Sequence, residues 1–223
     1  SGHILTLEDP VEFIFQNKKS IVNQPEVGTD TRAFEIALKN ALRQAPDCIL
    51  IGEIRDKQTM SMALAYSQSG HLCLATLHAN NSYHAMNRII NFYPLENRPA
   101  LLLDLSAALS SVISQRLVRT KTGARVAAVE VLLNTRHVAE LIEKGEISEI
   151  KEALEKSMSP GSQTFEQALF KLFMDGKITQ DEAMANADSA TNMLWLINQA
   201  TAGELSLSGA GAGARAEAAR RKK

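Results

Sequence analysis

The sequence has 223 residues, of which 45% are apolar and 22% charged, and its formal net charge is -1. These values are typical of a soluble globular protein that can bury a substantial core, and they give no global field that would favour nucleic acid or an anionic membrane. No apolar run approaches the ~20 residues that cross a bilayer, and no signal peptide is visible, so we expect a cytoplasmic protein without direct membrane insertion.

In the first half of the chain, short apolar runs alternate with segments in which the apolar residues recur at helical spacing. Strands are predicted at residues 4–7, 11–15, 20–23, 48–51 and 72–77, and helices at residues 32–43, 56–67 and 83–91. This alternation predicts an α/β fold with a parallel sheet and crossover helices. Ligands bind at the carboxyl ends of the strands in such sheets.

The second half changes character. A long helix is predicted over residues 101–117 and a strand over 126–133, followed by helices only. Thr164 with Gln167, and Thr179 with Glu182, have the spacing of a capping box. Beyond about residue 205 the composition becomes Gly/Ala-rich and basic, which predicts a solvated tail.

An acidic cluster follows the first predicted strand. Glu8, Asp9 and Glu12 place three carboxylates within five residues. Clustered carboxylates repel one another unless a cation or hydrogen-bond donors lie between them, and Mg²⁺ bound through water would meet that need. A solvated acidic turn is the alternative interpretation.

A second group surrounds the apolar run at residues 48–51. Glu53 follows this strand after Gly52, where its carboxylate could orient a water for attack on a phosphate. Arg43 and Arg55 flank the segment and could bind phosphates, or could pair with neighbouring aspartates.

Two histidines bracket the predicted strand at residues 72–77. His71 and His78 would lie about 23 Å apart at ~3.3 Å per residue, which argues against a shared metal ion. His78, at the carboxyl end, could contact a γ-phosphate, and His71 could face a neighbouring subunit. Either could instead be an ordinary surface or packed histidine. The two cysteines form no CxxC pair, so buried reduced thiols are predicted in place of a zinc or redox site.

In order and spacing these segments resemble the type II/type IV secretion ATPase superfamily. Residues 4–13 resemble its Asp box, residues 46–56 its Walker B segment, and residues 70–80 its His box. The resemblance runs from about residue 3 to about residue 200. It implies a RecA-like P-loop ATPase core, incomplete at its N-terminus and followed by a helical C-terminal extension.

The nearest resemblance within the superfamily is to the twitching-motility pilus retraction ATPases of the PilT/PilU type. The four-cysteine zinc subdomain usual in pilus-extension and type II secretion ATPases has no counterpart here. Residues 137–144 lack the two arginines of a PilT retraction motif, while residues 38–47, 71–81 and 187–190 look more PilU-like. Pro25 occupies a position at which the family often has an arginine. If that arginine acts on a nucleotide bound by a neighbouring subunit, its role is lost in this chain or is taken by another residue.

The resemblance also implies roles for individual residues. Glu53 resembles the catalytic glutamate, and His78 resembles the γ-phosphate contact, with His71 as its companion. The Asp-box acids near Mg²⁺ and the attacking water correspond to Glu8, Asp9 and Glu12, of which Glu12 is a second catalytic candidate. ATP and Mg²⁺ are the implied cofactors.

No GxxxxGK[ST] motif occurs in the sequence, although the family places its phosphate loop just upstream of the Asp box. The chain also opens without an initiator Met, so we expect a fragment that cannot hydrolyse ATP alone. Three segments are expected: a truncated core at 1–133, a helical subdomain at 134–200, and a flexible basic tail at 201–223.

The resemblance implies a parent protein that is a hexameric ATPase at the inner-membrane base of the type IV pilus, powering retraction through a platform protein, with no nucleic-acid partner. Two alternatives stay open. The chain could be a non-catalytic assembly or regulatory module that acts with a complete PilT-like ATPase, or part of a related type II secretion ATPase.

Overall fold

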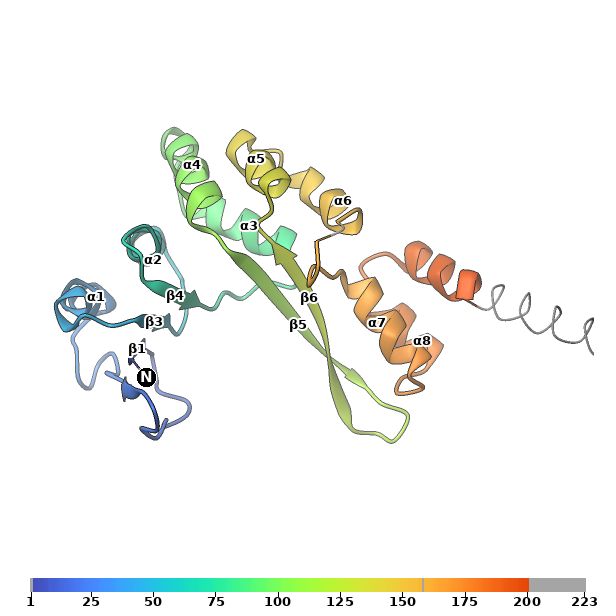
Figure 1. Cartoon of the computed structure of the whole chain (residues 1–223), viewed down its shortest axis with the longest axis horizontal. Helices are drawn as coiled ribbons and strands as arrows, with labels where there is room; N and C mark the ends of the chain where they lie inside the picture. The colour runs from blue at the N-terminus through green and yellow to red at the C-terminus, as the bar shows by residue number, and fades with distance from the viewer. Residues whose placement is uncertain (1, 158, 201–223) are drawn as a thin grey trace, which may run out of the picture. The chain divides into compact units, whose positions relative to one another are not determined.

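The structure is a computed structural model that describes residues 2–157 and 159–200. The described residues divide into two compact units, the first made of residues 2–114, 131–157 and 159–162, the second of residues 115–130 and 163–200. The predicted boundary after residue 133 falls inside the first unit, and the predicted basic tail lies outside the described residues. Figure 1 shows the elements in chain order.

The first unit is built on a four-stranded parallel sheet. Its strands are β1 (His3–Leu7), β2 (Ile21–Asn23), β3 (Cys48–Ile51) and β4 (Leu72–Ala75), in the order β2-β1-β3-β4. Leu7 pairs with Ile51, which in turn pairs with Ala75, so β1, β3 and β4 end level with one another. The predicted parallel α/β fold is confirmed.

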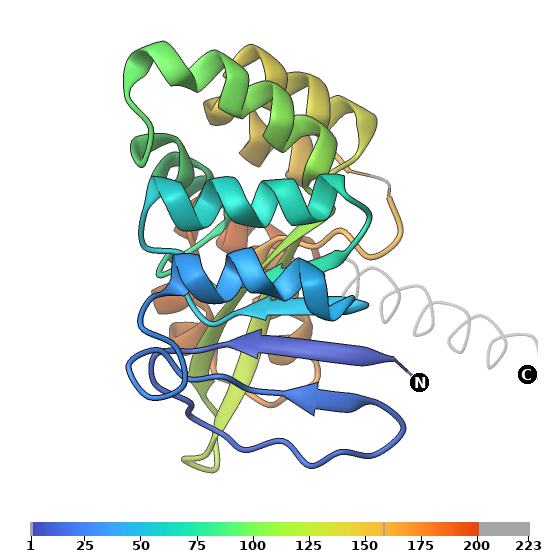
Figure 2. The ribbon, with the colours of Figure 1, turned by 90° about the vertical axis from the view of Figure 1, so that its left-hand side faces the viewer.

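Two crossover segments cover one face of this sheet. They are α1 (Phe34–Ala41), continued by the 3₁₀ turn η1 (Leu42–Gln44), and α2 (Lys57–Gln68), and Figure 2 shows the two helices side by side. Alternate residues of β1 and β3 point into this layer, because Leu5, Leu7, Ile49 and Ile51 are buried. Asp56 caps α2 by accepting a hydrogen bond from the Thr59 amide.

Helices complete the first unit. They are α3 (Ser82–Asn91), η2 (Leu95–Asn97), α4 (Arg98–Ala108), α5 (Arg136–Lys144), η3 (Ile147–Glu149) and α6 (Ile150–Glu155). Leu101 and Leu105 of α4, and Leu141 and Ile142 of α5, are buried in the same core cluster as the sheet. No helix among the described residues has both the length and the apolar character needed to cross a bilayer.

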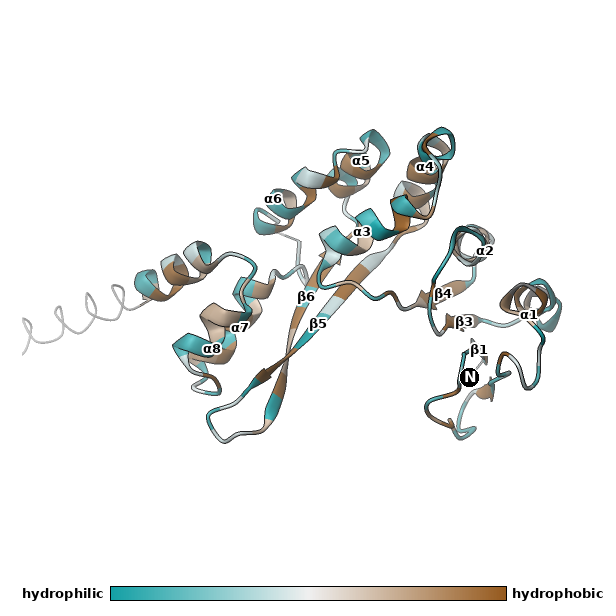
Figure 3. Cartoon of the chain, turned by 180° about the vertical axis from the view of Figure 1, so that it is seen from behind, coloured by the Kyte–Doolittle hydropathy of each residue, from teal (hydrophilic) through white to brown (hydrophobic). Residues whose placement is uncertain are grey.

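The prediction of one helix over residues 101–117 is wrong. Helix α4 ends at Ala108, and a hairpin of β5 (Ser111–Arg119) and β6 (Arg125–Leu133) follows. Burial along β5 has a period of two, with Ser114 and Val118 inside, and Figure 3 shows apolar and polar residues interspersed along both strands. Val112 happens to continue the helical spacing of the leucines at residues 101–109. The sequence pattern therefore does not reveal that the helical period ends before β5 begins.

The prediction of a strand at residues 11–15 is also wrong. Residues 11–20 are irregular and mostly exposed. Side chains accept the backbone hydrogen bonds that a neighbouring strand would otherwise accept. The amide of Val11 donates to Glu26 Oε2 at 2.9 Å, and that of Phe15 donates to Gln24 Oε1 at 2.7 Å. Once these groups are satisfied, a neighbouring strand has fewer backbone partners to offer.

The second unit packs α7 (Phe165–Met174) and α8 (Gln180–Asn186) around the distal part of the hairpin. The predicted capping box at Thr164 is complete, and Thr179 accepts the amide of Glu182 at the next helix. Arg116 of β5 stacks over the Phe165 ring at 3.9 Å and pairs with Asp188. It is therefore a strand residue held in a packed ion pair.

Candidate functional site

Three parallel strands end at the same edge of the sheet, and polar residues follow each of them. After β1 come Glu8 and Asp9, after β3 come Glu53 and Arg55, and after β4 comes His78. The strands are buried and level, so their apolar sequences fix where these side chains emerge. Five of the eight predicted site residues lie at this edge.

Glu53 is at the centre of this group. Arg55 Nε donates to its Oε2 at 2.6 Å, and His78 Nε2 lies 3.2 Å from its Oε1. Arg55 Nη1 also lies 3.5 Å from Asp9 Oδ2, so one guanidinium joins the carboxylates that follow β1 and β3. The Glu53 side chain is 15% exposed while that of His78 is 80% exposed, so the cluster opens to solvent on the histidine side.

The charges around Glu53 lower the pKa of its carboxyl group below the ordinary value. The hydrogen bond from Arg55 is the main cause, and the positive charges of Arg55, His78 and Arg88 add to it against partial desolvation. Glu53 is therefore ionised at neutral pH. An ionised carboxylate can accept a proton or orient a water molecule, which is the chemistry that the sequence predicted for it.

Glycine is needed at position 52 because the ends of β1 and β3 come close together there. Its amide donates to the Leu7 carbonyl at 2.7 Å, and a Cβ at this position would lie 3.0 Å from that oxygen and 3.2 Å from Glu8 Cα. The crowding comes from the end of β1. Glycine thus lets Glu8 and Glu53 emerge beside each other, and Thr76 Oγ1 donates to the Gly52 carbonyl from the third strand.

Glu8 is held from two sides. Thr6 Oγ1 donates to its Oε1 at 2.8 Å, and Gln24 Nε2 donates to the same atom at 3.2 Å. Gln24 also donates to the Phe13 carbonyl at 3.0 Å, so this amide connects Glu8 with the irregular segment that follows. Glu12 is exposed on that segment and, among the described residues, forms no ion pair with the Glu53 cluster.

The described residues contain no group of three or more His, Cys, Asp or Glu side chains that could hold a metal ion. This arrangement differs from a closed carboxylate site at Glu8, Asp9 and Glu12. It is compatible with Mg²⁺, which keeps several waters and is usually held by one or two carboxylates together with substrate phosphates. The prediction of Mg²⁺ bound through water therefore stays a prediction.

Two predicted residues lie at the other end of the sheet. Arg43 is exposed in η1 before β3, and His71 precedes β4, where its Nδ1 lies 2.9 Å from Ser69 Oγ. The structure does not bring either of them to the Glu53 cluster. Asp47, the aspartate nearest to Arg43 in the sequence, accepts a hydrogen bond from the His3 amide at 2.7 Å.

Sequence reasoning missed the residues that position the acids. Thr6, Gln24 and Thr76 hold Glu8 and Gly52, and Arg88 of α3 contributes charge near Glu53. Thr6 and Thr76 could have been noticed as hydroxyls at the ends of apolar strands. Gln24 lies in a loop and gives no pattern.

Comparison with known proteins agrees with this geometry. The family model described as "Type II/IV secretion system protein" matches residues 1–185. The chain belongs to this family. Members most similar to it include the type IV pilus ATPase PilU of Pseudomonas aeruginosa, 50% identical over 198 residues that cover 88% of this chain and 52% of PilU. PilT of the same organism, a type IV pilus retraction ATPase, is 39% identical over 85% of this chain and 55% of PilT.

A solved structure of this secretion ATPase family has the same fold. The crystal structure of the pilus retraction motor PilT with bound ADP matches with a TM-score of 0.78 and 39% identity, covering 86% of this chain and 54% of that one. The predicted fold class and the predicted family are both confirmed. The chain spans about half the length of the relatives it matches.

Proposed function

We propose that this chain is the hydrolytic half of an ATP-driven motor that powers type IV pilus retraction. Support comes from the Glu53 cluster at the carboxyl edge of the sheet and from the similarity to PilU and PilT. The proposal includes a hexameric parent protein, or assembly with a PilT-like paralogue, in the cytoplasm at the inner-membrane pilus base. A platform protein of the pilus is the proposed partner.

The roles proposed for the cluster follow from its contacts. Glu53, ionised and partly buried, would orient the attacking water and accept its proton. His78 is exposed beside it and can donate to a phosphate oxygen, and the Arg55 guanidinium can turn from the carboxylates to a phosphate. ATP would supply the phosphates, and Mg²⁺ would supply charge neutralisation next to them.

The remaining predicted residues have more distant roles in this proposal. Glu8 and Asp9 would contact Mg²⁺ through water, and Glu12, on the exposed segment, is a second acidic candidate. Arg43 and His71 are at the opposite end of the sheet from Glu53, so they would contribute to nucleotide binding only through a neighbouring subunit.

Glu53→Gln in the full-length protein tests the central claim. Because the amide cannot accept the proton, we expect ATP turnover to fall by about 100-fold or more. Binding of a fluorescent ATP analogue should change little, because glutamine keeps the shape of the side chain. Glu96→Gln, at an exposed glutamate of η2, is the matched control and should leave turnover unchanged. Unchanged turnover in Glu53→Gln would remove Glu53 from its role.

The chain by itself tests the requirement for a phosphate loop. Its 223 residues contain no GxxxxGK[ST], and we expect no Mg²⁺-dependent turnover from the purified chain. Clear turnover would contradict this. If the chain instead changed the turnover of a complete PilT-like ATPase while Glu53→Gln had no effect, the module interpretation would replace the catalytic one.

A further inference from the structure

The tip of the β5–β6 hairpin carries two arginines opposite each other. The amide of Thr120 donates to the Ala124 carbonyl at 2.8 Å, which fixes the register of the two antiparallel strands. In this register Arg119, the last residue of β5, lies opposite Arg125, the first residue of β6. Residues that face each other in this way have Cβ atoms about 5 Å apart, so the two guanidinium groups share one small area of the surface.

Both arginines lie on the outer face of the hairpin. Burial alternates along the strands: Val118 and Ala128 are buried in the core of the second unit, so the odd-numbered positions face outward. Arg119 and Arg125 are exposed, and so is Lys121 in the turn between the strands. Three cations therefore gather at one end of the hairpin, although the net charge of the whole chain is -1.

The charges at the tip are not balanced within the described part of the chain. Among residues 2–157 and 159–200, none of the three side chains forms an ion pair with an Asp or Glu. Two acids nearby are engaged elsewhere, since Glu182 accepts the backbone amide of Arg119 at 2.8 Å and Asp175 Oδ2 lies 3.8 Å from Lys177 Nζ. Like charges directly opposite each other destabilise a sheet. The arginine pair therefore costs stability unless an anion outside the chain lies over it.

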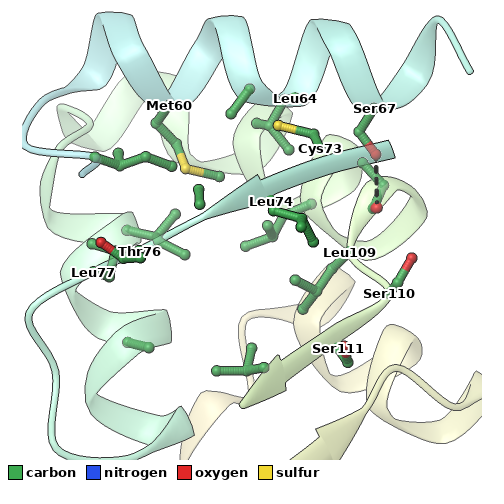
Figure 4. A pocket seen from close by; sticks show the side chains of 18 of the residues that line it. Met60, Leu64, Ser67, Cys73, Leu74, Thr76, Leu77, Leu109, Ser110 and Ser111 are labelled. Carbon is green, nitrogen blue, oxygen red and sulfur yellow. Dashed lines mark hydrogen bonds between the residues drawn. The ribbon is translucent and has the colours of Figure 1, made fainter. Parts of the chain in front are cut away.

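The tip is convex. Figures 1 and 2 show the turn of the hairpin projecting beyond α7 and α8. The apolar cavity of about 550 Å³ that Figure 4 shows is lined by other residues, and so is a second cavity of about 490 Å³ beside Leu5 and Ile36. Small ligands bind in concave sites. A projecting tip with three cations suits a broad anionic surface instead.

An apolar side chain continues the outer face. Leu117 lies two residues before Arg119 on β5 and is 54% exposed, and Ala127 opposite it is exposed too. Cations beside an exposed leucine favour adsorption to a bilayer, because the charges meet lipid phosphates while the apolar group reaches the headgroup boundary. Residues 117–127 contain no aromatic ring on which the bases of a single-stranded nucleic acid would stack.

We propose that the tip of the β5–β6 hairpin contacts the surface of a bilayer that contains anionic phospholipids. Arg119, Lys121 and Arg125 bind lipid phosphates, and Leu117 lies at the level of the headgroups, without crossing the bilayer. The inference goes beyond the proposed ATP hydrolysis and does not depend on it, because the Glu53 cluster belongs to the first unit and the tip to the second.

Vesicle flotation tests the contact. The full chain would be mixed with vesicles in which phosphatidylglycerol makes up about a third of the lipid, and with vesicles of phosphatidylcholine alone. We expect binding to the first and none to the second. Raising NaCl from about 0.1 M to about 1 M should release the chain, because the Debye length falls from about 10 Å to about 3 Å.

Paired substitutions locate the contact. Each cation near an anionic surface changes the affinity about fivefold, so Arg119→Gln together with Arg125→Gln should weaken binding about 25-fold. Lys39→Gln together with Lys151→Gln removes the same charge from exposed positions of α1 and α6 and should leave binding unchanged. Arg119→Lys together with Arg125→Lys keeps both charges and should bind nearly as well as the parent, because a lipid surface responds to charge.

Thermal stability separates a binding role from a structural one. Because the like charges face each other, Arg119→Gln alone should raise the melting temperature at low salt, and the gain should shrink in about 1 M NaCl. A lower melting temperature at low salt would mean that Arg119 holds the hairpin together, and the proposal would fail.

Other results would also overturn the proposal. They include no binding of the parent chain to the anionic vesicles, and equal losses from the hairpin pair and the lysine control pair. A loss only with Arg220→Gln and Arg221→Gln would assign the contact to the basic end of the chain. A loss with the Arg→Lys pair as large as with the Arg→Gln pair would indicate bidentate recognition of one specific anion. Tighter binding to a DNA duplex than to the vesicles at the same salt would favour nucleic acid.

Discussion

Gly52→Ala is the sharpest structural test of how the acidic cluster is positioned. The added Cβ would lie 3.0 Å from the Leu7 carbonyl oxygen and 3.2 Å from Glu8 Cα, so the end of β1 must move by a few tenths of an ångström. Little space exists for that movement, because Leu7 and Ile51 are fully buried on the same two strands. Overpacking of this kind costs ~1–3 kcal/mol, and the reduced entropy of the unfolded chain offsets ~0.4–1 kcal/mol.

The expected net change for Gly52→Ala is therefore a loss of about 1–2 kcal/mol in the free energy of unfolding. Urea denaturation measures it, and Gly52→Ser should cost more because its side chain is larger. ATP turnover of the full-length protein should also fall, since Glu8 and Glu53 are moved apart. Gly123→Ala is the control: its φ of +84° adds backbone strain, but nothing lies within 4 Å of the new Cβ, so turnover should persist. A Gly52→Ala protein with unchanged stability and turnover would refute the crowding argument.

Three further predictions concern single side chains. Arg55→Gln removes the donor that chiefly lowers the pKa of Glu53, so this pKa rises and the acid limb of the turnover–pH profile should move to higher pH. If the acid limb of the profile stayed at the same pH, Arg55 would not be the main cause of the lowered pKa of Glu53. Thr164→Ala removes a capping box and should lower the free energy of unfolding by ~1 kcal/mol, measured with urea, whereas exposed Thr122→Ala should not. Arg116→Met loses the Asp188 ion pair and should cost ~2 kcal/mol; a melting temperature equal to the parent's would contradict this.

The buried strands could be predicted from the sequence because local signals agree there. Residues 48–51 form a short apolar run between Pro46-Asp47 and Gly52, and both the strand and the crossover helix after it are found as expected. The β5–β6 hairpin could not be predicted in full. Its first strand carries Val112, Ile113 and Val118 in a pattern that also continues the leucine spacing of α4, and only packing in three dimensions selects the strand.

For the candidate site, the sequence predicts the residues that follow the strands but not the contacts that position them. Glu53 and His78 each follow a predicted strand, and parallel strands end at one edge, so the sequence places both residues at that edge and His71, which precedes its strand, at the other end. The contact between Arg55 and Asp9 joins residues 46 positions apart and depends on the register between β1 and β3. The support of Glu8 by Gln24 comes from an irregular loop, whose path no periodic pattern encodes.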